Sequence, residues 1–299
     1  MSLFDRAVVT GLPLVPKFVV GKVAARYVAG ETLDSAVEAI RELNEDGASA
    51  TVDLLGEEVT ERATAEKAAA EYHRILERIV ADGLDCNISV KPTQMGLEID
   101  ETFCRDTYDG VVAAAKEKGL FVRLDMEDHT TIDATLRIFR WLHDRYGNVG
   151  PVFQSYMRRT LRDIAEMPAE GANVRLCKGI YIEPREVAWQ GYDVVRLNFL
   201  AALEKLLRQG VYVGIATHDE YLICGAVALV DKLDVPRDQY EFQMLLGVEP
   251  ALRRILLAGG HPLRVYVPYG TDWYHYSVRR LRENPKLAGH VMRAMLRGE

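Results

Sequence analysis

Polar side chains recur where the short β-rich segments of this sequence end. Eight such segments can be drawn along the chain, and a charged or hydrogen-bonding residue closes or follows each of them. One such residue alone is more simply a solvated loop charge or a helix cap. Recurrence at every segment instead predicts one shared polar site, because strand carboxyl ends meet at one face of a parallel barrel. The residues are Asp53 and Glu57, Lys91, Asp125, Gln154, Arg175 with Lys178, Thr217 with His218, Gln243, and Tyr266.

The segment Val174 to Pro184 (VRLCKGIYIEP) places two of these cations beside a small-residue turn. Arg175 and Lys178 end an apolar strand, and Gly179 follows. Two cations beside free backbone N–H groups favour an anion such as pyrophosphate, or the electron-rich edge of a flavin. Lys178 alone has a second interpretation, since a lysine at a barrel strand end can form a Schiff base if burial lowers its pKa.

A basic helix is predicted near the C-terminus, from Tyr274 to Asn284 (YHYSVRRLREN). Tyr276, Arg279, Arg280 and Glu283 follow one another at i, i+3, i+4 and i+7, which places them on one helix face. Paired guanidiniums beside a tyrosine suit the clamping of a carboxylate. The alternative is a solvated face held by Arg–Glu pairs.

The cysteines and His218 are not spaced as metal ligands usually are. The four cysteines show no C-x-x-C spacing, which argues against a zinc site and a disulfide framework and favours a reducing compartment. His218 has only Tyr221 and Leu222 at i+3 and i+4, so a hydrogen-bonding role is expected for it and no metal site is predicted.

The polar residues need a scaffold that brings strand ends together. Amphipathic helical patterns lie between the β-rich segments, and this alternation predicts a (β/α)8 barrel. A doubly wound open sheet is the alternative, although no G-x-G-x-x-G follows the first strand. The expected strands are Ser49 to Leu55, Asn87 to Val90, Leu120 to Asp125, Val149 to Gln154, Asn173 to Cys177, Val211 to Thr217, Tyr240 to Leu245 and Leu263 to Val267. The helical patterns include Thr32 to Asp46, Thr64 to Ala81, Thr102 to Lys118, Ile132 to Tyr146, Tyr192 to Arg208 and Glu249 to Ala258.

The pattern divides the chain into an N-terminal helical arm, residues 1–46, packed on a catalytic barrel, residues 47–299, with the C-terminal helix over the active-site face. The net charge of −7 argues against a nucleic-acid binder, which needs a clustered excess of Lys and Arg. Charges and prolines interrupt the apolar N-terminal stretches, so neither a signal peptide nor a membrane span is predicted. Leu12, Leu14, Val15, Phe18, Val19 and Val20 beside scattered cations leave a peripheral membrane contact as a secondary hypothesis.

Six segments together resemble the proline dehydrogenase family, in the family's order and from the first strand to the final helix. The Arg-Leu-x-Lys-Gly-x-Tyr and Tyr-x-x-Arg-Arg-Leu-x-Glu-Asn motifs are the most specific. The segments are ISVKPTQMG (Ile88 to Gly96), LDMEDH (Leu124 to His129), RLCKGIYIEP (Arg175 to Pro184), ATH (Ala216 to His218), EFQMLLG (Glu241 to Gly247) and YVPYGTDWYHYSVRRLREN (Tyr266 to Asn284).

This resemblance implies non-covalently bound FAD in the barrel and the oxidation of L-proline to Δ1-pyrroline-5-carboxylate, the first step of proline catabolism. Hydride would leave proline C5 for flavin N5, and the electrons would pass to a quinone. The protein's contribution would be mainly positioning and desolvation, because the flavin carries the redox chemistry.

The resemblance also assigns roles by matched position. Asp125 and Arg175 are the expected catalytic residues, Asp125 as counter-charge and Arg175 beside flavin N5 and N1, where a cation stabilises the reduced ring. Arg279 and Arg280, with Lys91 as a third cation, are expected to pair with the substrate carboxylate. The other expected substrate contacts are Leu176, Tyr181, Leu245, Tyr266 and Tyr276.

The matched flavin-binding positions include Arg175 again, and Glu283 is expected to anchor the flavin tail or hold Arg280. Glu57 resembles the family's partner of Arg279, so the two predict a gate that closes over the substrate, with the adjacent Glu58 as the alternative for that role. Cys177 and Ile180 depart from the aliphatic residue and alanine that are usual in the family. The flavin positions are Met126, Gln154, Arg175, Lys178, Gly179, Ile180, Thr217, His218, Gln243 and Glu283.

Two other functions fit a barrel of this kind. A Schiff-base lyase would use Lys178, but it gives the arginine pair no purpose. A catalytically silent barrel that binds an imino acid is disfavoured because the expected catalytic and substrate-binding residues are all present: Lys91, Asp125, Arg175, Tyr266, Arg279 and Arg280. The expected setting is cytoplasmic, with peripheral contact at the inner membrane as the secondary hypothesis, and a homo-oligomer is compatible with the sequence.

Overall fold

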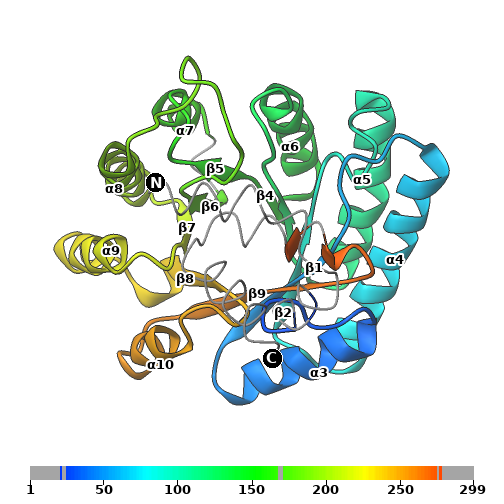
Figure 1. Ribbon diagram of the computed structural model, residues 1–299, viewed down its shortest axis with the longest axis horizontal. Coiled ribbons are helices and arrows are strands. Elements are labelled where there is room, and N and C mark those ends of the chain that lie inside the picture. The colour runs from blue at the N-terminus through cyan, green and yellow to red at the C-terminus, as the bar shows by residue number, and fades with distance from the viewer. Residues whose placement is uncertain (1–20, 22–24, 168–170, 275, 278–299) are drawn as a thin grey trace, which may run out of the picture.

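The strands of the computed structural model form one parallel sheet (Figure 1). The structure describes residues 21, 25–167, 171–274, 276 and 277. Within them the order is β4-β3-β2-β1-β9-β8-β7-β6-β5, and every neighbouring pair is parallel. The strands are β1 (Ser49–Leu54), β2 (Cys86–Val90), β3 (Val122–Leu124), β4 (Val149–Gly150), β5 (Val152–Gln154), β6 (Asn173–Cys177), β7 (Tyr212–Ala216), β8 (Tyr240–Leu245) and β9 (Leu263–Tyr269).

The fourth predicted strand is divided in two by Pro151. Proline has no N–H to donate to a strand ladder, and here β4 pairs with β3 while β5 pairs with β6. The two ends of the sheet order are therefore consecutive in the chain, and the sheet closes through this one segment. The predicted (β/α)8 barrel is confirmed, with a break in its fourth strand.

The helices surround the sheet in chain order (Figure 1). Thr32 begins the first with a capping box shared with Ser35, and this helix, part of the predicted N-terminal arm, packs against β9 and β1. The sequence patterns did not single out α7, which is short, or α9, which is apolar on most sides. The helices are α3 (Leu33–Glu45), α4 (Arg62–Ala81), α5 (Glu101–Glu117), α6 (Ile132–Tyr146), α7 (Thr160–Ala165), α8 (Tyr192–Arg208), α9 (Glu220–Lys232) and α10 (Pro250–Ala258), with a 3-10 turn η2 (Arg237–Gln239).

The two faces of the strands carry different chemistry. Outward side chains such as Val174 and Leu176 are fully buried against the helices. The inward face is polar rather than lined with the branched apolar residues common in such barrels. Arg123 is 1% exposed inside the barrel, where it donates to the carbonyl oxygens of Pro151 and Asn173 at 3.0 and 2.6 Å. Burial lowers its pKa to about 9.

Gly150 allows the close approach of β3 and β6 that Arg123 bridges. A Cβ at this position would lie 1.8 Å from the carbonyl oxygen of Asn173 and 2.8 Å from Nη1 of Arg123.

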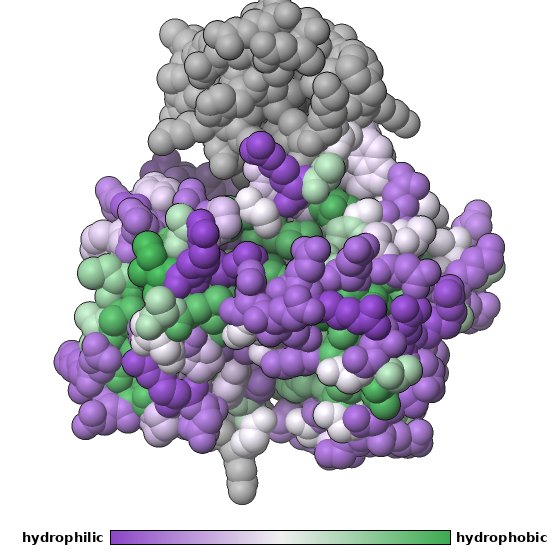
Figure 2. All heavy atoms as spheres, turned by 90° about the horizontal axis from the view of Figure 1, so that it is seen from below, coloured by the Kyte–Doolittle hydropathy of each residue, from purple (hydrophilic) through white to green (hydrophobic). Residues whose placement is uncertain are grey.

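Outside the barrel, the face shown in Figure 2 is mostly hydrophilic, with hydrophobic side chains interspersed. No helix among the described residues is long and apolar enough to span a membrane.

Candidate active site

A cavity of about 890 Å³ opens at the carboxyl ends of the strands. Its walls include the inward residues of β6, β8 and β9 and the loops that follow β2, β3, β6 and β7. Most of the predicted site residues meet there. Those that line it are Lys91, Asp125, Met126, Gln154, Arg175, Lys178, Gly179, Ile180, Tyr181, Thr217, His218, Gln243, Leu245, Tyr266 and Tyr276.

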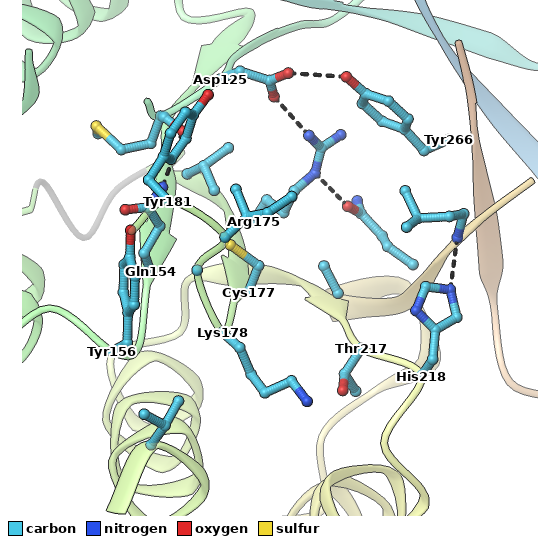
Figure 3. A pocket seen from close by; sticks show the side chains of 18 of the residues that line it. Asp125, Gln154, Tyr156, Arg175, Cys177, Lys178, Tyr181, Thr217, His218 and Tyr266 are labelled. Carbon is cyan, nitrogen blue, oxygen red and sulfur yellow. Dashed lines mark hydrogen bonds and ion pairs between the residues drawn. The ribbon is translucent and has the colours of Figure 1, made fainter. Parts of the chain in front are cut away.

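Arg175 lies at the centre of this cavity and pairs with Asp125 (Figure 3). Its Nη1 lies 2.7 Å from Oδ1 of Asp125, and the hydroxyl of Ser89 donates to the same oxygen at 2.6 Å. The other carboxylate oxygen accepts from Tyr266 at 3.2 Å. Both members of the pair are more than nine-tenths buried. Asp125 is therefore held from three directions with its charge compensated.

A second ion pair stands beside the first. Lys91 Nζ lies 2.6 Å from Oδ1 of Asp53 and 4.0 Å from Oδ2 of Asp125. Burial alone lowers the pKa of Lys91, but the charges of Asp53 and Asp125 outweigh it and raise the pKa above its ordinary value. Lys91 is thus a cation at neutral pH, oriented chiefly by Asp53. The sequence placed Asp53 in the site without identifying this role.

Tyr266 completes the cluster as a hydrogen-bond donor. Burial, and then the charge of Asp125, raise the pKa of its phenol well above the ordinary value. The hydroxyl therefore keeps its proton and donates to Asp125, with Lys91 Nζ at 3.5 Å. The four charges of Lys91, Arg175, Asp53 and Asp125 cancel, so the cluster is neutral although it is strongly polar.

Glu127 is a buried carboxyl of this cavity that the sequence did not single out. It accepts from the backbone N–H and the hydroxyl of Thr93, at 2.8 and 2.7 Å. Burial raises its pKa to about 7, despite these bonds. Thr93 also accepts from the N–H of Glu58 at 2.9 Å, so Glu127 supports the loop that carries Glu57. Its position two residues after Asp125, just past the end of the same strand, was the sequence feature that could have identified it as a site residue.

The opposite wall offers hydrogen-bonding groups and close backbone approach. His218 Nε2 accepts from the N–H of Leu245 at 2.8 Å, so the neutral ring carries its proton on Nδ1. This agrees with the hydrogen-bonding role predicted for it. Gly179 has φ +106°, and a Cβ there would lie 2.2 Å from the ring of Tyr156. Only glycine fits both the backbone conformation and the space.

The two cations of the VRLCKGIYIEP segment do not form one anion site. Arg175 faces Asp125, whereas Lys178 lies 3.3 Å from Asp219 and points away from Arg175 in Figure 3. Arg196 contacts the same carboxylate at 2.8 Å. The Lys178 side chain is 31% exposed and ion-paired, which is not the desolvated setting that Schiff-base chemistry requires.

Several predicted residues are not placed in the cavity wall. Leu176 is fully buried in the core, because strand alternation turns it away from the side that Arg175 faces. Glu57 is half-buried in the loop after β1 and does not line the cavity. The remaining three predicted residues lie outside the described residues, and with them the arginine clamp and the gate: Arg279, Arg280 and Glu283.

The described residues contain no group of three or more His, Cys, Asp or Glu placed to hold a metal ion. One side of the cavity carries two cations paired with two carboxylates, and the other side carries hydrogen-bonding groups and the turn at Gly179. Such a cavity suits a small zwitterion beside a larger organic group.

The family model for proline dehydrogenase matches residues 36–293. The chain belongs to the proline dehydrogenase family. A proline dehydrogenase of Deinococcus radiodurans is 39% identical over 92% of this chain and 90% of its own length. Proline dehydrogenase 1 of Bacillus subtilis is 36% identical over 92% and 91%.

The fold also matches solved structures. Proline utilization A (PutA) from Bdellovibrio bacteriovorus superposes with a TM-score of 0.82 at 24% identity, covering 88% of this chain. This chain spans about a third of that protein, 32% of its length. As a family member, the chain is a flavoprotein oxidoreductase of proline catabolism.

Proposed function

We propose that this proline dehydrogenase holds FAD in the barrel cavity, oxidises L-proline to Δ1-pyrroline-5-carboxylate and passes the electrons to a quinone. The observation that carries the proposal is the buried Asp125–Arg175 pair, flanked by Lys91 and Tyr266, at the centre of a cavity large enough for substrate and cofactor.

Three features of the cavity fit FAD. Its volume of about 890 Å³ lies within the range of pockets that enclose large organic ligands. The carbonyl oxygen of the Gln154 side chain is buried without a hydrogen-bond partner among the described residues, so an acceptor is available to a ring N–H. Gly179 lines the cavity without a side chain, which leaves the ring of Tyr156 its place in the wall. We assign the cofactor to Met126, Gln154, Arg175, Lys178, Gly179, Ile180, Thr217, His218 and Gln243, with Glu283 at its tail.

When bound, FAD supplies the two-electron acceptor for the hydride that leaves proline C5. The ring nitrogen gives up its proton to solvent, and its electron pair forms the C=N bond of the product as hydride leaves C5. Arg175 places a fixed positive charge in a desolvated cavity, where it favours electron density arriving next to it. Asp125 and Ser89 hold that guanidinium, so little reorganisation is needed during the reaction.

The substrate side requires a site for a carboxylate beside an apolar ring. We propose that Arg279 and Arg280 bind the carboxylate, with Lys91 as the third cation. Asp53 and Asp125 already balance Lys91 and Arg175, so the added arginine charges remain for the substrate. Tyr181, Leu245 and Tyr276 line the cavity where the ring would pack, and Glu57 with Arg279 would form the gate.

The test is the visible spectrum of the purified protein, recorded anaerobically before and after L-proline is added. A flavin spectrum that bleaches with L-proline establishes cofactor, substrate and direction of electron flow together. D-proline serves as the control for specificity. A colourless protein that stays unresponsive after incubation with FAD contradicts the proposal. Reoxidation by a soluble quinone analogue then tests the acceptor.

A further inference from the structure

A second charged layer lies inside the barrel, below the cavity. Glu241 of β8 and Arg264 of β9 are paired there, with Nε of Arg264 2.9 and 3.0 Å from the two carboxylate oxygens. Nη1 of Arg264 also donates to the carbonyl oxygen of Ala50 at 2.6 Å. Glu241 is 5% exposed and does not line the cavity. The proposed chemistry gives it no direct role.

Glu241 nevertheless reaches the cavity through one side chain. The amide nitrogen of Gln243 donates to Oε1 of Glu241 at 2.6 Å, and the amide oxygen accepts from Nε of Arg175 at 2.6 Å. Arg175 then continues to Asp125 through Nη1, on the other side of the guanidinium (Figure 3). A continuous line of hydrogen bonds therefore runs from the second layer to the reaction centre.

Donor and acceptor chemistry gives this line one direction. An ionised carboxylate only accepts, and a guanidinium only donates. Gln243 must therefore turn its NH2 to Glu241 and its oxygen to Arg175. A reversed amide would set N–H against N–H at Arg175 and oxygen against oxygen at Glu241. Leaving buried polar groups without partners is costly. Glu241 therefore determines which end of the Gln243 amide faces Arg175.

Gly214 provides the space that this arrangement needs. In the strand register it lies between Arg175 of β6 and Glu241 of β8. A Cβ at this position would lie 2.3 Å from the amide nitrogen of Gln243. The backbone of Gly214 does not have a positive φ. The glycine is therefore needed for room and not for conformational freedom.

We propose that Glu241 is a positioning residue of the oxidation, because it fixes the amide of Gln243 and thereby holds the guanidinium of Arg175 in place beside the flavin. The inference rests on the proposed function, since it assigns Arg175 to the flavin. Glu241 acts at a distance and touches neither substrate nor cofactor.

Two double variants separate this role from a purely structural one. E241M/R264M and E241Q/R264M both remove the buried ion pair as a unit, which avoids leaving one charge alone. They differ in whether position 241 can accept the N–H of Gln243. We expect E241M/R264M to show a more negative flavin midpoint potential and an anaerobic flavin reduction by proline about 10- to 100-fold slower, while E241Q/R264M remains close to the wild type.

FAD stoichiometry and melting temperature are measured for both. Equal potentials and equal rates in the two double variants overturn the proposal. If neither variant folds, G214A decides, because its added Cβ displaces the Gln243 amide without removing a charge. A normal potential and rate in G214A then overturns it. Failure of the wild type to bind FAD or to be reduced by proline counts against the proposed function instead.

Discussion

The guanidinium of Arg175 is held by neighbours from several strands, and this fixes what its replacement should do. Nε bonds Gln243 and Nη1 bonds both Ser89 and Asp125. A lysine keeps the positive charge, so Asp125 is not left as a lone buried carboxylate. It cannot reproduce contacts that leave in two directions from one plane.

We therefore expect R175K to lower the rate of flavin reduction by proline about 100-fold or more, with a change in melting temperature of at most about 4 °C. Stopped-flow absorbance and thermal unfolding measure the two effects. R137K is the control, since Arg137 pairs with Glu101 on the surface. A stable R175K enzyme with wild-type reduction kinetics would contradict the role given to Arg175.

Glu127 makes the stability of the protein depend on pH. Burial raises the pKa of its carboxyl from the ordinary 4.5 to about 7 in the folded state. At low pH the group is protonated in both the folded and the unfolded chain. Between pH 4.5 and about 7, the unfolded chain releases the proton and the folded chain keeps it, so folding stability falls as pH rises. The full loss, about 3 kcal/mol, is reached above pH 7.

E127Q removes this titration. We expect its free energy of unfolding, relative to the wild type, to rise by roughly 2 to 3 kcal/mol between pH 5 and 8, as measured by urea unfolding of the holoprotein. E101Q is the control, because Arg137 lowers the pKa of Glu101 below its ordinary value, which is the direction opposite to the shift of Glu127. A difference between E127Q and wild type that does not change with pH would rule the prediction out.

The sequence predicted which polar residues stand at the strand ends, but it did not predict which side chains pair with them. Alternation and the family motifs placed Lys91, Arg175 and Tyr266 correctly at the cavity. That Asp53 orients Lys91 follows from the pairing of β1 with β2, which no local pattern encodes. Leu176 lies on the strand face opposite Arg175, and a motif match does not distinguish the two faces of a strand.

At the scale of elements, the turn after β6 controls the cofactor wall. G179A introduces a Cβ that collides with the ring of Tyr156, at a backbone conformation that favours glycine. We expect FAD affinity to fall at least about tenfold, the effect of losing roughly 1.4 kcal/mol. Titration of apoprotein with FAD measures it.

G210A is the matched control for that variant. Gly210 has φ +71°, but a Cβ there meets nothing within 4 Å. It therefore bears the conformational cost alone. Equal FAD affinities in G179A and G210A would show that the close contact with Tyr156 does not shape the cofactor site.

Regular elements with one clear period were predicted within a few residues, as for α6 and β6. Two departures have local causes. Pro151 divides the fourth strand, because it has no N–H to donate to the strand ladder, and the residues before and after it pair with different neighbours. Helix α9 has no distinct polar face in its middle, EYLICGAVALVDK, so a helical period was not visible there.

At the scale of the whole molecule, the N-terminal residues are where contact with a membrane, in which a quinone would be dissolved, is expected. Residues 1–20 contain apolar side chains and cations, and they lie outside the described residues. We expect deletion of residues 1–20 to reduce binding to anionic liposomes while sparing activity with a soluble dye. Neutral liposomes are the control for the electrostatic part, and unchanged liposome binding contradicts the idea.

The break at Pro151 has a further consequence. The strands on either side of the divided segment, β3 and β6, are also joined by side chains, through Arg123 to Asn173 and through Asp125 to Arg175. The second of these links is itself the centre of the cavity. Hydrogen–deuterium exchange of the amides in β5 should therefore respond to changes in charge at the reaction centre. The divided strand then serves as a reporter, in time-resolved exchange, of charge changes at the reaction centre beside it.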